Sequence, residues 1–133
     1  MTSTAFFIPL SLVMALTVWS CAVTWYYWPW ARGSGKARTC IFMGLSQEYD
    51  DRPGPVRDAL AKSQRDWRDT VAQVAMTGVS EQEFRKDLDA EQFAFEFIGI
   101  GMIFQQYCKL LEDRKAERRA YTAFEALLAR SRA

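Results

Sequence analysis

The chain has 133 residues, enough for one domain with a modest hydrophobic core. Its 17 basic and 16 acidic residues leave a formal net charge of +1, so no overall field draws it towards nucleic acid. It has no histidine and three widely separated cysteines, which excludes the commonest general base, a zinc-ligand pattern and a disulfide framework.

The first 31 residues have no charge, and all charged residues lie between Arg32 and Arg132. Residues 5–28 are almost entirely apolar, and as a helix they would extend roughly 36 Å, enough to cross a bilayer core of about 30 Å. Aromatic and then basic residues follow, as they do at the cytoplasmic end of a membrane span. The pattern predicts a hydrophobic helix over residues 1–31. It either spans a membrane through residues 5–28, is buried in a soluble core, or is foreign to the ancestral domain.

Residues 32–38 are predicted to form a flexible basic linker, because glycine and serine there alternate with basic residues. From residue 39 onward the apolar residues recur at helical spacing, which predicts an all-α domain over residues 39–133. Its first helix covers residues 39–49. That helix ends before a turn with two prolines, because proline lacks a backbone N–H donor.

The second predicted helix begins at Pro55 and ends near Thr77. Proline suits the first turn of a helix, and Gly78 is the expected stop in the left-handed conformation. Ser80 and Glu83 have the spacing of a capping box, which predicts one brief helical turn after this helix.

The third predicted helix is the longest and has apolar residues on two faces. Asp89 and Gln92 open it with capping-box spacing, and it extends over about residues 90–112. A helix that is apolar on both sides must be covered on both sides, and a chain this small has few helices left to do so. This pattern predicts a homodimer. The broad stripe consists of Phe93, Phe97, Ile100, Phe104, Tyr107 and Leu111, and the shorter opposite stripe of Phe95, Ile98 and Met102.

The last predicted helix covers about residues 115–129 and has a single apolar face.

Two glycines, Gly99 and Gly101, lie inside the long third helix, and each costs roughly 1 kcal/mol relative to alanine. The two glycines indicate either the close approach of another helix or room for a ligand.

No residue pattern indicates catalysis. Glu48, Asp50 and Asp51 cluster before a turn, where aspartate is favoured for local hydrogen bonding. Ser80 has no histidine to activate it. We therefore predict that the chain is not an enzyme and uses neither a metal nor another cofactor.

Several stretches, taken in this order, resemble a known family. They are residues 40–42, Glu48 ahead of residues 51–60, Trp67, residues 87–96 and residues 126–130. In these stretches residues 40–133 resemble the carboxy-terminal regulatory domain of the TetR family of transcriptional regulators. The resemblance implies a helical bundle whose last two helices pair with those of a second subunit, and a cavity in each subunit that binds a small inducer.

Members of that family begin with a helix-turn-helix head that grips DNA. Residues 1–38 do not resemble this head, because they are too few and their basic residues all lie in the linker. We therefore expect a ligand-sensing domain that lacks a DNA-binding head, with no direct DNA binding by this chain alone.

The resemblance and the helix faces together suggest two sets of site residues. A small apolar or aromatic inducer is expected in one set, with Gln105, Gln106 and Tyr107 as candidate polar groups nearby. The other set is expected at the dimer interface. The ligand set is Phe42, Leu45, Trp67, Val71, Phe97, Ile100 and Phe104, and the interface set is Phe95, Ile98, Met102, Tyr121, Phe124 and Leu128.

Two functions fit these expectations. The first is the ligand-sensing and dimerisation module of a TetR-type regulator in the cytoplasm. The alternative is a single-pass membrane protein that is tethered to the inner membrane through residues 5–28 and has a cytoplasmic helical domain for binding another protein.

Overall fold

The computed structural model describes the backbone of residues 41–133 and the side chains from residue 44 onward. This part of the chain forms helices and no strand, apart from an isolated antiparallel bridge between Phe84 and Arg132. The predicted all-α fold is confirmed, whereas the predicted hydrophobic helix (1–31) and linker (32–38) lie outside the described residues. The helices are α3 (Ile41–Tyr49), α4 (Pro55–Ser80), α5 (Ala90–Lys109) and α6 (Ala116–Ser131).

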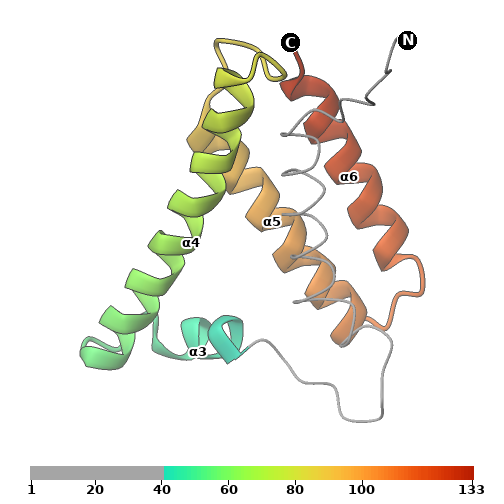
Figure 1. Ribbon diagram of the computed structural model, residues 1–133. Coiled ribbons are helices and arrows are strands. Elements are labelled where there is room, and N and C mark those ends of the chain that lie inside the picture. Colours follow the sequence, from blue (N-terminus) through green and yellow to red (C-terminus); the bar gives the residue numbers. More distant parts are fainter. Residues whose placement is uncertain (1–40) are drawn as a thin grey trace, which may run out of the picture.

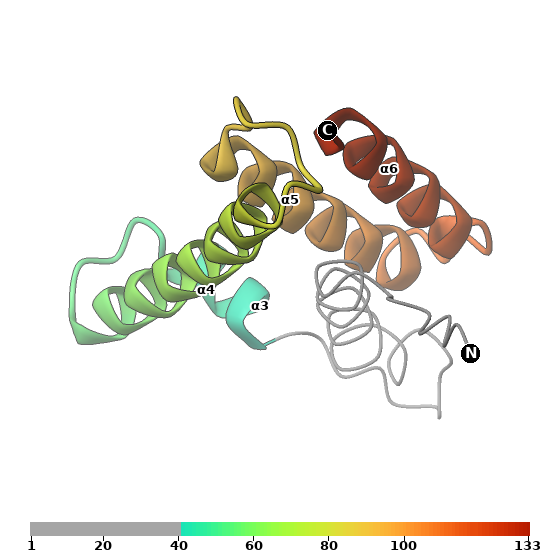
Figure 2. The same ribbon diagram turned by 45° about the horizontal axis from the view of Figure 1, so that its top comes forward.

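Helices α4 and α5 meet at one end and diverge towards the other (Figures 1 and 2). They meet beside the loop that joins them, and α6 returns alongside α5 to the same end (Figure 1). The short helix α3 lies near the far end of α4, where α4 and α5 are widely separated (Figure 1). The described bundle is therefore closed at one end and splayed at the other.

The closed end contains the main hydrophobic core, to which α4, α5, α6 and the α4–α5 loop all contribute. A chain of phenylalanine rings runs through it, with centroids 5.6 Å apart for Phe84 and Phe93, 6.4 Å for Phe93 and Phe97, and 5.8 Å for Phe97 and Phe124. These separations are typical of favourable aromatic packing. The remaining buried members are Val71, Ala75, Ala94, Leu127 and Leu128.

A smaller cluster joins the carboxy-terminal half of α5 to the start of α6. Phe104 is buried there against Ala116 and Ala120, with Tyr107 and Cys108 at its edge. The buried and half-buried members of this cluster all come from α5 and α6.

The end of α4 differs from the prediction. The helix continues through Gly78 to Ser80, so the predicted left-handed stop at Gly78 is wrong. Gly78 is instead a contact point, because a Cβ atom there would lie 2.6 Å from Cδ2 of Phe84. The chain turns at Gln82, which has a φ of 62°, and the backbone N–H of Phe84 donates to the carbonyl of Gly78 at 3.0 Å.

The predicted helical turn from Ser80 to Glu83 is also wrong. Ser80 is the last residue of α4, and its hydroxyl donates back to the carbonyl of Thr77 at 2.8 Å. The backbone N–H of Glu83 donates to Gly78, which closes the end of α4 and starts no new helix. The sequence pattern failed because it could not anticipate that Phe84 folds back onto α4.

The predicted cap of α5 is confirmed in its first half. The carboxylate of Asp89 accepts from the backbone N–H groups of Glu91 and Gln92, both at 3.0 Å. The side chain of Gln92 turns forward and donates to Glu96 at 2.9 Å, so it does not complete a reciprocal box. Helix α5 ends at Lys109, and α6 extends to Ser131, two residues further than predicted.

Candidate functional site

Four of the predicted ligand residues lie in or beside the main core. Val71 and Phe97 are buried there, with 1% and 6% of their surface exposed. Trp67 and Ile100 are half-buried and pack against that core. These four residues are therefore brought together by the crossing of α4 and α5, but two of them are already covered by the chain itself.

The remaining predicted ligand residues are dispersed. Phe104 lies in the smaller cluster between α5 and α6. Leu45 is half-buried on α3 and belongs to neither cluster, and the side chain of Phe42 lies outside the described part. A site that includes them all would have to extend from the core into the region where α4 and α5 diverge (Figure 2).

The candidate polar groups on α5 differ sharply in burial. Gln105 has 5% of its surface exposed, whereas the neighbouring Gln106 is exposed. Tyr107 is half-buried at the edge of the smaller cluster. The amide of Gln105 is therefore the buried polar group that α5 offers to a ligand.

A shallow apolar depression of about 350 Å³ lies at the start of α4. It is lined by Pro55, Val56, Ala59 and Leu60, of which Leu60 alone is buried. This lining has no polar side chain that could orient a bound molecule, so the depression defines no specificity.

The outer face of α5 is unusually apolar. Phe95 is 73% exposed, and Met102 and Ile103 are roughly half exposed on the same side of the helix. Gly99 lies among them, and a Cβ atom added there would have no neighbour within 4 Å. We call Phe95, Gly99, Met102 and Ile103 the outer α5 face.

The other predicted interface residues divide between surface and core. Tyr121 on α6 is 53% exposed. Phe124 and Leu128 are buried in the main core of their own chain, and Ile98 is half-buried against that core. Ile103 and Gly99 were not in the predicted interface set, although their helical position beside Phe95 and Met102 could have placed them there.

An ion pair marks the junction of α5 and α6 at the edge of this face. Arg130 donates through its guanidinium to the carboxylate of Glu96. The hydrogen bond from Gln92, together with that from Arg130, holds the pKa of Glu96 below its ordinary value, although partial burial opposes this. Burial raises the pKa of the Cys108 thiol, which lowers its reactivity as the apolar sequence context indicated.

The part of the chain that the structure describes contains no group of three or more histidine, cysteine, aspartate or glutamate residues placed to hold a metal ion. Among the helices from residue 41 onward, none is both long enough and apolar enough to cross a membrane. The predicted span over residues 5–28 lies outside the described residues.

The structure also draws attention to a residue that sequence reasoning missed. Phe84 is buried between α4 and α5, with 7% of its surface exposed. It lies in a loop among charged residues, so no periodic pattern marks it as core. Its only sequence signal is that it is an isolated aromatic residue in a short polar connection.

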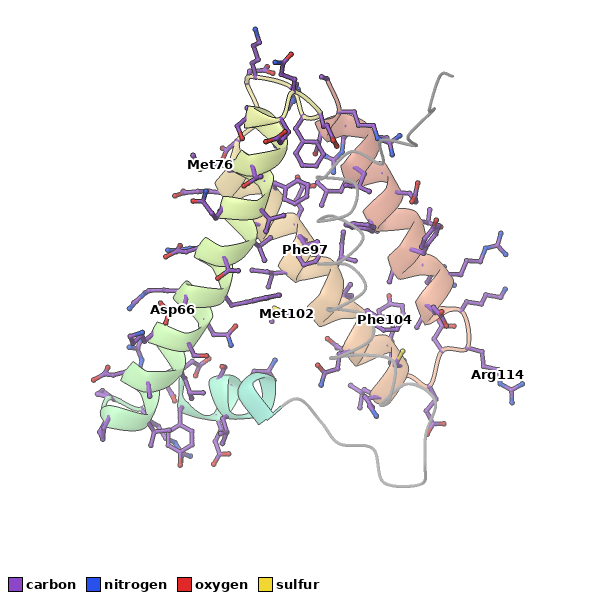
Figure 3. The ribbon with its side chains drawn as sticks, viewed as in Figure 1. Asp66, Met76, Phe97, Met102, Phe104 and Arg114 are labelled. Atoms are coloured by element: carbon purple, nitrogen blue, oxygen red, sulfur yellow. The ribbon has the colours of Figure 1, made fainter. Side chains whose placement is uncertain are left out.

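Figure 3 shows how labelled side chains lie on α4, on α5 and in the turn before α6. Asp66 and Met76 lie on the side of α4 that faces away from α6, and Arg114 extends outward from the turn before α6 (Figure 3). Phe97 and Phe104 follow one another along α5 (Figure 3).

A comparison with known protein families gives a match. A family model described as "Tetracyclin repressor-like, C-terminal domain" matches residues 21–124, which include α3, α4, α5 and most of α6. The match begins inside the hydrophobic stretch 5–28 and covers well over half of the chain. No curated protein and no solved structure matches the chain. The resemblance inferred from the sequence is thereby confirmed.

Proposed function

Because this chain belongs to the family of tetracyclin-repressor-like carboxy-terminal domains, we propose that it is the ligand-sensing and dimerisation module of a TetR-type transcriptional regulator. The family is one of regulatory domains and not of enzymes. A regulator of this type acts in the cytoplasm, and we place the described domain there. The membrane-tethered alternative rests on residues 5–28, part of which the family match includes.

The observation that carries the proposal is the outer α5 face. Large apolar side chains that stay exposed together usually mark a surface that another protein covers. Glycine inside a helix costs roughly 1 kcal/mol relative to alanine, and nothing in the described part of the chain requires Gly99 to lack a side chain. A partner helix that packs closely on this face would explain both features.

Helix α6 provides a matching surface beside this face. Ala123 and Ala126 are exposed and lie on the same stripe of α6 as Arg130, which pairs with Glu96 of α5. Small side chains on one helix and large apolar side chains on its neighbour allow two such helix pairs to interlock. We therefore assign the dimer contact to the outer α5 face and the adjoining side of α6.

The ligand-sensing part of the proposal is supported by the residues on the sides of α4 and α5 that face each other before the two helices diverge (Figure 1). Trp67 and Ile100 are half-buried at the edge of the main core, and Gln105, further along α5, is buried. We propose that a small ligand binds on this inner side of α5. Such binding would alter the angle between α4 and the α5–α6 pair and so the geometry of the dimer.

Sedimentation velocity of the full chain at tens of micromolar tests the dimer. The wild-type chain should sediment as a dimer, and Phe95→Glu should give a monomer, because it introduces a charge into an apolar contact without disturbing the core. Met76→Glu is the matched control, since Met76 is an exposed apolar residue on the far side of α4 and its variant should remain a dimer. A wild-type monomer at these concentrations would contradict the proposal.

Gly99→Ala tests the same face in a second way, because a packed face and an open face predict opposite effects on stability. If a partner helix packs there, the added methyl group should weaken the dimer roughly tenfold, although alanine is the better helix former. An unchanged dimer together with a higher melting temperature would show that the surface at Gly99 is open, and the interface would have to lie elsewhere.

A further inference from the structure

Two polar side chains are buried in the described part of the chain, Gln105 and Ser131. The hydroxyl of Ser131 donates to the carbonyl of Leu127 at 2.8 Å, so its burial is satisfied within α6. By contrast, no described residue donates to or accepts from the side-chain amide of Gln105, although only 5% of its surface is exposed. Buried polar groups without a partner are rare in proteins, and each requires an explanation.

The position of Gln105 on α5 gives the direction of its side chain. Gln105 follows Ala94 by three helical turns, so both lie on the same stripe of α5. Ala94 is fully buried in the core with Val71 and Ala75 of α4, which makes this the α4-facing stripe. The amide is therefore on the inner side of α5, at the level where α4 has diverged.

The inner stripe of α4 supports the same geometry. Gln64 lies three residues before Trp67 and seven before Val71 on that stripe, yet it is exposed. Helix α4 therefore does not cover α5 at the level of Gln105. The buried amide thus lies on the α4-facing side of α5 and belongs to neither hydrophobic cluster.

We propose that Gln105 is the polar anchor of the ligand site and that the ligand carries an uncharged hydrogen-bonding group, such as a carboxamide, on an aromatic or aliphatic body. This inference rests on the ligand-sensing function proposed above. A primary amide offers both a donor and an acceptor, so a ligand carboxamide can meet it with two hydrogen bonds. The ligand thus supplies the partner that the described residues do not.

The stripe of α5 that carries Gln105 offers no counter-charge to a charged ligand group. The stripe from Ala94 to Cys108 consists of alanine, isoleucine, glycine, glutamine and cysteine, with no charged side chain. A carboxylate or ammonium group buried there would lack a counter-charge, which is far more costly than burying a neutral amide. We therefore expect the site to prefer neutral compounds over charged ones.

The first test needs no ligand and compares Gln105→Met with Gln106→Met in the full chain. Methionine has nearly the shape of glutamine without its polar atoms, so Gln105→Met should raise the melting temperature by roughly 4–8 °C. Gln106→Met alters the exposed neighbour on the same helix and should leave the melting temperature within about 2 °C of the wild-type value. A lower melting temperature for Gln105→Met would mean that the amide holds the fold together and would overturn the inference.

The second test uses three naphthalene probes of similar shape and isothermal titration calorimetry. They are 2-naphthamide, its hydrocarbon isostere 2-isopropenylnaphthalene, and the anion 2-naphthoate. Wild-type chain should bind the amide about five- to tenfold more tightly than the hydrocarbon, as expected for hydrogen bonds in a buried site, and the anion most weakly. In Gln105→Met this preference for the amide should disappear, while Gln106→Met retains it.

The outcomes separate this inference from the function on which it rests. Equal binding of amide and hydrocarbon by the wild-type chain would overturn the role of Gln105 and leave the ligand-sensing function standing. Tightest binding of the anion would overturn the assigned ligand class. Failure of all three probes to bind either the wild-type chain or Gln105→Met would count against ligand sensing itself and so against both proposals.

Discussion

Helix α5 is packed differently along its two halves. In the amino-terminal half, Phe93 and Phe97 lie between α4 and α6, and the ring of Phe97 meets that of Phe124 edge-on. In the carboxy-terminal half, Phe104 packs in a cluster whose members come from α5 and α6, with none from α4. The same helix therefore contributes to a three-helix core at one end and to a two-helix contact at the other (Figure 1).

This difference suggests that the two halves of α5 have different roles. The closed half provides apolar burial, which is the main source of folding stability. The splayed half retains the buried amide of Gln105 without a partner among the described residues. The fold can tolerate the free-energy cost of burying this amide because the closed half stabilises the fold independently of Gln105.

The largest expected effect tests whether the closed half provides the stability. Phe97→Ala should lower the free energy of unfolding by about 3–5 kcal/mol, because it empties a site in the core to which three helices contribute. Phe95→Ala removes the same side chain from the outer α5 face, where it is 73% exposed, so it should lower the apparent stability by less, and only through weaker association. Urea unfolding followed by circular dichroism measures both, at one protein concentration because association adds to apparent stability.

Similar losses of stability in Phe97→Ala and Phe95→Ala would contradict this expectation. That result would mean that the inner and outer faces of α5 contribute equally to folding, as in a dimer that has no stable folded monomer. The description of the closed half as an independent core would then be wrong.

A smaller effect is expected where α4 ends. Gly78→Ala should lower the free energy of unfolding by about 1–3 kcal/mol, because the new Cβ would lie 2.6 Å from Cδ2 of the buried Phe84 ring. Alanine is otherwise the better helix former, so a loss of stability isolates the clash. The double variant Gly78→Ala with Phe84→Leu should lose less than the sum of the two single variants. Simple additivity would contradict the contact.

The same contact shows where sequence reasoning ended. The faces of α4 and α5, the cap at Asp89 and the two-sided character of α5 follow from local spacing and capping chemistry, and the structure contains them. The role of Gly78 could not be predicted, because it depends on Phe84 returning from a loop six residues later. A glycine near the end of a helical pattern fits a left-handed stop and a tight contact equally well.

The burial of Gln105 illustrates a second limit. Gln105 and Gln106 are adjacent, and both lie away from the broad apolar stripe of α5. Which of them is covered depends on the angle at which neighbouring helices cross α5, and sequence periodicity does not give that angle. The direction of a helix face was therefore predictable, whereas the arrangement of the splayed end was not.

The smallest expected effect concerns the polar contact that ties α5 to α6 at the closed end. Glu96→Gln should lower the free energy of unfolding at pH 7 by about 0.5–1 kcal/mol, because it weakens the bond with Arg130, whose side chain is largely exposed. The pKa of Glu96 is held below its ordinary value of 4.5, first by the hydrogen bond from Gln92 and further by Arg130.

The direction of that shift fixes the pH dependence of the difference. A carboxyl group whose pKa is lower in the folded state than in the unfolded state stabilises the fold above its unfolded pKa. The advantage of the wild-type chain over Glu96→Gln should therefore be constant above about pH 5.5 and decline as the pH falls below 4.5. Urea unfolding of both chains at pH 7, 5 and 3.5 measures this difference, with Glu81→Gln as the control for an exposed carboxylate at the end of α4. A difference that grows as the pH falls would show that Glu96 is destabilised by burial more than it is stabilised by Gln92 and Arg130.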